Sequence, residues 1–145
     1  MAPMTPQTDL LGDILRSAHV VAVLGAHSEA GRPAFYVPDY MHSMGARILP
    51  VNPLLAGQVL WGETVRSRLA ELQQRIDVVD VFRRSEALPD HLDDLLAMSP
   101  LPRVVWLQSG IRNDAVASRL SAAGVQVVQD RCMLAEHRAR RLPSL

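Results

Sequence analysis

The segment with the clearest chemical potential is a loop, GAHSEAGRP, that begins at Gly25 and ends at Pro33. It follows an apolar run and leads into an amphipathic segment. Proline suits the first turn of a helix, because its missing N–H would be unsatisfied there anyway. The free amides and positive dipole end of such a helix suit a phosphate group. We therefore predict an anion-binding turn after Gly25.

This loop is not the dinucleotide fingerprint GxGxxG. The fingerprint needs glycine two residues after Gly25, where this chain has His27. The next apolar run ends in Asn52 and Pro53 instead of the acidic residue that holds an NAD ribose. An NAD-binding protein is thus disfavoured, although it stays an alternative.

Polar residues and glycine also follow the other apolar runs of the chain. They are Asn52-Pro53, Phe82-Arg83-Arg84, Gln108-Ser109-Gly110 and Asp130-Arg131-Cys132. Open α/β sheets bind ligands at the carboxyl ends of their strands. We expect these residues to meet the anionic and amide groups of a ligand. Arg83 and Arg84 are adjacent, so at most one of them is expected to face the cleft.

Composition excludes several classes of function. All 15 cationic residues are arginine, so a Walker phosphate loop and Schiff-base chemistry, which need lysine, cannot be built. Zero formal net charge and six aromatic residues argue against a nucleic-acid partner. The apolar runs are too short to cross a membrane, and no secretory signal opens the chain. The cytoplasm is the expected location, and the sequence permits a monomer or a small homo-oligomer.

The sequence offers no catalytic constellation and no metal site. Cys132 is the single cysteine, which excludes an internal disulfide and a thiolate-rich zinc site. The five histidines lack the close spacing of metal ligands. His27 and Ser28 are neighbours, and adjacent side chains seldom face each other as a nucleophile and its base would.

The elements that must position these residues alternate regularly. Strands are expected at 19–25, 47–52, 76–82, 103–108 and 125–129, and helices at 33–44, 88–98 and 113–123. We also expect a leading helix over 8–18 and a short helix near 67–73. Near-continuous apolar strands separated by helices predict an α/β fold, a doubly wound parallel five-stranded sheet with helices on both faces. We expect one domain over 1–145, with a leading helix in 1–18, a core in 19–132 and a basic C-terminal tail in 133–145.

Five sequence blocks follow one another along the chain: AVLG at 22–25 with Arg32-Pro33, PVNP at 50–53, DVVDVFR at 77–83, WLQ at 106–108 with Gly110, and VVQDRC at 127–132. In these blocks and their order, the chain resembles the small stand-alone CoA-binding proteins, which share a Rossmann-like domain with the α subunit of succinyl-CoA synthetase. The blocks span nearly the whole chain. The phosphorylated histidine and the nucleotide-grasp domains of the synthetase lie outside this module.

The resemblance implies that coenzyme A lies across the strand ends as the ligand. Its pyrophosphate would meet the backbone after Gly25, including Ser28, with Arg32 nearby. His27 replaces the small hydroxyl residue of many members, which leaves its phosphate contact in doubt. The adenosine would rest near Asn52, Pro53, Phe82 and Arg83, and the pantetheine arm would pass Gln108, Ser109 and Gly110. The basic run from Glu136 to Arg141 is interpreted as a solvated helix face, and the alternative is that it reaches the 3′-phosphate of CoA.

The interpretation is a protein that binds CoA or an acyl-CoA without catalysis of its own. The alternatives are a CoA-ligase-like subunit that needs a partner chain, a CoA sensor that docks on another protein, and the NAD-binding protein. Each residue also has a plain structural interpretation: Asn52 in a turn, Phe82 and Trp106 in the core, Gln108 closing a loop. Cys132 is interpreted as a small buried residue. The alternative is that it forms a mixed disulfide with the CoA thiol.

Overall fold

A computed structural model describes residues 9–145. Five strands form the main sheet: β1 (Val20–Leu24), β2 (Arg47–Val51), β5 (Val78–Val81), β6 (Val104–Leu107) and β7 (Gln126–Val128). The helices are α1 (Leu10–Arg16), α2 (Pro33–Ser43), α3 (Leu88–Leu96), α4 (Asp114–Ala122) and α5 (Met133–Ala139). Two 3₁₀ turns, η1 (Leu69–Glu71) and η2 (Ser85–Ala87), and a short hairpin of β3 (Val59–Leu60) and β4 (Glu63–Thr64) complete the fold.

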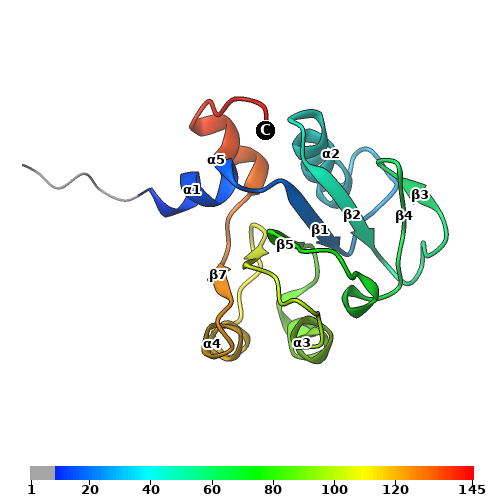
Figure 1. The fold of residues 1–145 in the computed structure, drawn as a ribbon, viewed down its shortest axis with the longest axis vertical. Coiled ribbons are helices and arrows are strands. Elements are labelled where there is room, and N and C mark those ends of the chain that lie inside the picture. Colours follow the sequence, from blue (N-terminus) through cyan, green and yellow to red (C-terminus); the bar gives the residue numbers. More distant parts are fainter. Residues whose placement is uncertain (1–8) are drawn as a thin grey trace, which may run out of the picture.

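The five main strands are parallel and lie in the order β2-β1-β5-β6-β7 (Figure 1). The three central strands are buried along nearly their whole length, which explains why their sequences are apolar without alternation. The predicted doubly wound, Rossmann-like parallel sheet is confirmed. The chain leaves β2 at one edge and returns to the other side of β1, so the strand order reverses between β1 and β5.

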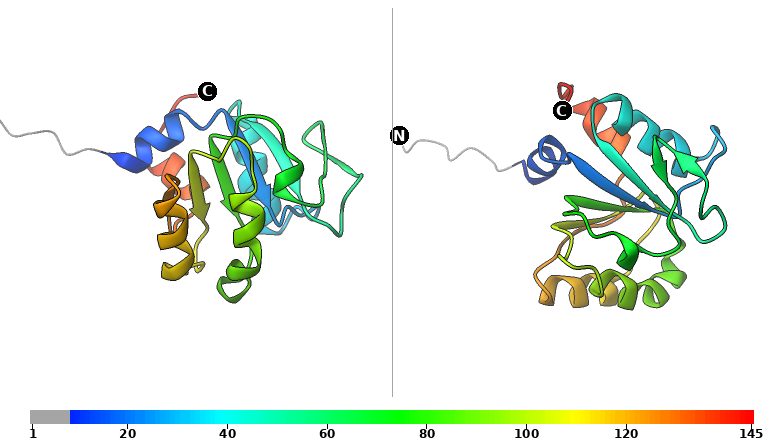
Figure 2. Two further views of the ribbon diagram at one scale, coloured as in Figure 1. Left: turned by 60° about the horizontal axis from the view of Figure 1, so that its bottom comes forward. Right: turned by 45° about the vertical axis from the view of Figure 1, so that its right-hand side comes forward.

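Helices cover both faces of the sheet. In Figure 1, α1, α2 and α5 lie on one side and α3 and α4 on the other, and the right-hand view of Figure 2 shows the same layers. Alternate residues of each strand enter different cores, as Val78 faces the α2 and α5 side and Val79 the α3 and α4 side. Trp106 is fully buried, in agreement with its core interpretation. No helix among residues 9–145 is both long and apolar enough to span a bilayer.

Residues 54–74 hold more structure than their sequence indicates. The expected short helix near 67–73 is the single 3₁₀ turn η1, and the β3–β4 hairpin precedes it. Trp61 in that hairpin packs its ring 5.5 Å from the ring of Phe35 in α2. Two-residue strands are too short for a period of two to be visible in a sequence.

The segment predicted as a basic tail contains helix α5, which packs against α1 and α2. His137 is buried, and its Nδ1 lies 2.7 Å from the hydroxyl of Tyr40. Arg140 pairs with Glu136 and with Asp9, the residue that caps α1. The arginines of this segment therefore lie in the last turn of a helix that covers the sheet or directly after it. The first part of the expected leading segment, residues 1–8, lies outside the described residues.

Asp80 is a fully buried carboxyl group in the middle of the central strand β5. Its strand neighbours are Val23 and Trp106, and neither of its oxygens has a hydrogen-bond partner among the described residues. Burial disfavours the charged form and raises the pKa of Asp80 well above its ordinary value. This carboxyl group therefore keeps its proton to higher pH than an exposed aspartic acid does.

Candidate functional site

A cavity of about 730 Å³ opens at the carboxyl ends of β1, β5 and β6. Gly25 follows β1 and Phe82 follows β5, so the cavity lies where the strand order reverses. Loops diverge at such a point and leave a crevice, which is the usual ligand site of this architecture. The volume is within the ordinary range for small-molecule sites, roughly 300–1,000 Å³.

Gly25 lines the cavity at a position that favours glycine. Its φ is +86°, a conformation that side chains rarely adopt, and its N–H donates to the carbonyl oxygen of Val51 over 2.9 Å. A Cβ atom here would lie 2.9 Å from the carbonyl oxygen of Phe82 and 3.0 Å from Cδ of Arg83. The close approach of the two chain segments thus depends on the missing side chain.

The loop after Gly25 is tied to the start of α2 by an unusual backbone contact. Pro38 lies inside α2 and has no N–H, so the carbonyl oxygen of Ala34 receives no helical hydrogen bond from it. The N–H of His27 donates to that oxygen over 3.3 Å. At the same helix end, Arg32 is the N-cap and makes no side-chain cap. Pro33 has no N–H, and the N–H groups of Phe35 and Tyr36 donate to the carbonyl oxygen of Arg32, which leaves the N–H of Ala34 for an anion.

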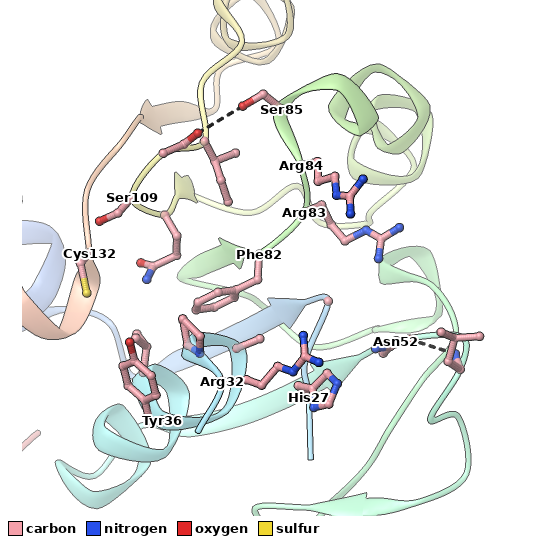
Figure 3. A pocket seen from close by; sticks show the side chains of 18 of the residues that line it. His27, Arg32, Tyr36, Asn52, Phe82, Arg83, Arg84, Ser85, Ser109 and Cys132 are labelled. Atoms are coloured by element: carbon pink, nitrogen blue, oxygen red, sulfur yellow. Dashed lines mark hydrogen bonds between the residues drawn. The ribbon is translucent and has the colours of Figure 1, made fainter. Parts of the chain in front are cut away.

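Three arginines lie together at one side of the cavity, Arg32, Arg83 and Arg84 (Figure 3). Both members of the Arg83-Arg84 pair line the cavity, although only one was expected to do so. Adjacent side chains point to opposite sides within a strand, but β5 ends at Val81, before the two arginines. These side chains supply the cationic groups that phosphate binding requires.

Two of these arginines already have partners. Nε of Arg32 donates to the carboxylate of Glu29 over 3.1 Å, and this bond lowers the pKa of Glu29 below its ordinary value. Nε of Arg83 donates to Nε2 of His91 over 3.2 Å. Burial and the nearby charge of Arg83 lower the pKa of His91, which keeps its ring neutral and able to accept. In both arginines, terminal guanidinium nitrogens remain for a ligand.

Asn52 connects β2 to this site through its side chain. Nδ2 donates to the carbonyl oxygen of Ala26 over 2.8 Å, and Oδ1 accepts from the N–H of Leu54 over 2.9 Å. The second bond is the turn that the structural interpretation of Asn52 expects. Leu54 and Leu55 line the cavity beside it, and Leu54 is 87% exposed. An apolar surface is thus left open at this end.

Gln108 and Cys132 line the cavity beside the end of β6. Gln108 is only 4% exposed, and its Oε1 accepts from the backbone N–H of Met133 over 2.9 Å. This bond matches the loop-closing interpretation and fixes the orientation of the amide. Gly110 has φ +80°, and its N–H donates to Asp130 over 2.6 Å. The loop after β6 is therefore held in place from the end of β7.

The structure brings most of the predicted site residues to this one cavity: Gly25, His27, Arg32, Asn52, Phe82, Arg83, Gln108, Ser109 and Gly110. Ser28 and Pro53 are exposed and do not line it. The ring of His27 is occupied locally, because its Nδ1 accepts from the N–H of Glu29 over 3.0 Å.

The sequence did not indicate several other lining residues, among them Tyr36, Leu54, Leu55 and Ser85. For Tyr36 a signal existed, since it lies three residues after Pro33 and therefore on the same face of α2 as the helix start. Among residues 9–145 there is no group of three or more His, Cys, Asp or Glu side chains that could hold a metal ion.

Comparison with known proteins finds relatives that match nearly end to end. An uncharacterised Bacillus subtilis protein, YneT, is 32% identical over 132 residues, which is 91% of this chain and 95% of that protein. A solved structure from Thermus thermophilus is 46% identical, with a TM-score of 0.84, and covers 89% of this chain and 95% of its own. A hypothetical protein from Pyrococcus horikoshii is 27% identical, with a TM-score of 0.82 and coverages of 96% and 98%.

The fold also occurs inside a larger enzyme. A dinucleotide-forming acetyl-coenzyme A synthetase from Ca. Korarchaeum cryptofilum matches 75% of this chain with a TM-score of 0.62, over 25% of its own length. Its 16% identity shows a shared fold alone. The sequence pattern described as the CoA binding domain matches residues 19–138, which include every residue of the cavity. The chain therefore belongs to the CoA binding domain family.

Proposed function

We propose that this protein binds CoA or an acyl-CoA in the cavity at the strand ends and has no catalysis of its own. The observation that carries the proposal is the polarity of the cavity within a member of the CoA binding domain family. Arg32, Arg83 and Arg84 lie at one side, and Ser109 and Cys132 at the other (Figure 3). CoA has the same polarity, with phosphates at one end and a thiol at the other.

Each part of CoA finds chemically suitable groups along the cavity. The pyrophosphate suits the Gly25 turn, the open N–H of Ala34 at the start of α2, and the two arginines Arg32 and Arg83. The adenosine suits the apolar surface of Leu54 beside Asn52. The amide-containing pantetheine arm suits the loop from Gln108 to Gly110. Ser28 and Pro53 keep only a backbone or peripheral role in this arrangement, because they do not line the cavity.

The proposal that the chain is a binder rests on the chemistry of the cavity walls. Among the described residues that line the cavity, the one histidine is His27, and its Nδ1 already accepts from a backbone N–H. No nucleophile with an adjacent general base is present among them. We propose that the protein binds CoA in the cytoplasm.

Calorimetry under reducing conditions tests the proposal with CoA, dephospho-CoA and NAD. We expect micromolar or tighter binding of CoA. Dephospho-CoA should bind about tenfold more weakly, since one charge-assisted phosphate contact is lost. NAD should bind least. Equal heats for the three ligands, or no heat with any of them, would contradict the proposal. Native mass spectrometry of freshly purified protein would identify a ligand that is retained.

A further inference from the structure

Cys132 is the single cysteine of the chain, and it lines the cavity proposed for CoA. It is half-buried at the N-cap position of α5, directly after β7 and its connecting loop. On the other side of the cavity lie Arg83 and Arg84 (Figure 3). A molecule that places phosphates on the arginines and spans the cavity therefore presents its far end to the sulfur of Cys132.

Gln108 gives a second, independent sign that a ligand occupies this end. It is 4% exposed and lines the cavity. Its Oε1 accepts from the backbone N–H of Met133, whereas its Nε2 stays accessible and is not hydrogen-bonded to another residue among 9–145. A fixed amide with one satisfied and one open polar group is suited to donate to a ligand carbonyl. The peptide-like arm of CoA carries such carbonyls shortly before its thiol.

We propose that Cys132 forms a mixed disulfide with the thiol of CoA, so that the cavity captures the coenzyme covalently. The inference rests on the proposed function and assigns a modification site to it. An acyl-CoA has no free thiol and is not captured, so the covalent state selects the unacylated coenzyme. The arginine side of the cavity orients the coenzyme, and Cys132 determines whether it stays bound.

The reaction is thiol–disulfide exchange with CoA disulfide as the co-reactant. The thiolate of Cys132 attacks one sulfur of the CoA disulfide, a new sulfur–sulfur bond forms to Cys132, and the old one breaks. The second CoA leaves as a thiolate and takes up the proton that Cys132 released. One disulfide is consumed and one is formed, so no further oxidant is needed. A reducing thiol reverses the step.

The test is intact-mass analysis of the full chain after incubation with CoA disulfide. We expect the mass to rise by one CoA less two hydrogen atoms, to return to its original value with dithiothreitol, and to stay unchanged in Cys132→Ser. Glutathione disulfide has the same reactive bond without the nucleotide. The wild type should react with CoA disulfide at least about tenfold faster than with glutathione disulfide, because binding orients the sulfur atoms.

A relocated cysteine provides the matched control. Ser121 is exposed on α4, on the opposite side of the sheet, and does not line the cavity. In the double variant Ser121→Cys/Cys132→Ser, the two disulfides should react at about equal rates, since nothing orients either of them. Equal rates in the wild type, or no adduct, would overturn the covalent inference.

Calorimetry of the wild type with reduced CoA separates this inference from the proposed function. Heat of CoA binding together with no adduct overturns the mixed disulfide alone and leaves CoA binding in place. Absence of heat overturns CoA binding, and the covalent inference with it. An adduct that forms preferentially from CoA disulfide supports both.

Discussion

Nδ2 of Asn52 donates to the carbonyl oxygen of Ala26 over 2.8 Å, and so the end of β2 holds the loop that follows β1. The two residues are 26 positions apart and both are buried, and Asn52 also lines the cavity. The same side chain accepts from the N–H of Leu54. One amide therefore fixes the loops on both sides of the proposed adenosine position.

Replacement of Asn52 by alanine should affect both stability and binding. Asn52→Ala leaves the buried carbonyl of Ala26 without this partner and should lower the free energy of unfolding by about 2 kcal/mol. It should also weaken CoA binding, because the Gly25 loop is released. Urea unfolding and calorimetry measure the two effects. The control is Asn113→Ala, which removes the N-cap of α4 at a cost of about 1 kcal/mol and should leave CoA affinity unchanged. Equal affinities in both variants would contradict the role of Asn52.

Replacement of Gly25 by alanine should lower stability more than replacement of a glycine that has a positive φ but open space around it. Gly25→Ala places a methyl group 2.9 Å from the carbonyl oxygen of Phe82, in addition to the strained positive φ. Gly124 also has a positive φ, of +92°, but no heavy atom lies within 4 Å of its added Cβ. Gly124→Ala should cost about 1 kcal/mol, and Gly25→Ala at least about 2 kcal/mol more, by urea unfolding. If both variants lose the same stability, the close approach of Phe82 to Gly25 does not constrain the fold.

The contact between Arg83 and His91 predicts a positioning role for His91. Arg83→Gln should weaken CoA binding about tenfold, as expected for one charge-assisted phosphate contact. His91→Leu should weaken it about threefold, because the guanidinium loses the acceptor that orients it. In the Arg83→Gln background the His91 change should have no further effect. Arg16→Gln removes a surface arginine that pairs with Asp13 on α1 and should bind CoA normally. Additive effects of the two substitutions would show that His91 acts independently of Arg83.

Asp80 predicts a pH dependence of stability with a definite sign. Its pKa is raised by burial, so the folded chain keeps a proton that the unfolded chain releases above its ordinary pKa of 3.8. The stabilisation is complete below that value and is lost as pH rises toward the raised pKa, by up to about 1.4 kcal/mol per pH unit. Asp80→Asn has no such proton to lose. The free energy of unfolding of Asp80→Asn minus that of the wild type should therefore increase from pH 5 to pH 7, as measured by urea unfolding. A constant difference over this range would contradict the burial argument.

Much of the fold could be predicted from the sequence, because burial on both faces leaves a strong apolar signal. The run VVAVL at Val20–Leu24 and the run VVWL at Val104–Leu107 are read directly as inner strands. The β3–β4 hairpin left no comparable signal, since its strands have two residues each. Nor did the basic composition of 133–141 reveal that His137 would be buried against Tyr40. Such contacts depend on distant partners and not on local periodicity.

The sequence by itself determined the parallel α/β architecture, the arginine-only cationic groups and the positions that follow each strand. It also placed Gly25 directly after β1 and Pro33 at the start of α2, because both positions suit the local backbone geometry. Only the tertiary structure decided which residues share the cavity. It brought Arg83 and Arg84 to one side and Cys132 to the other, and it left Ser28 outside. The reason is physical: strand ends converge through hydrogen bonds between strands far apart in sequence, and the loops then pack according to contacts that no local pattern encodes.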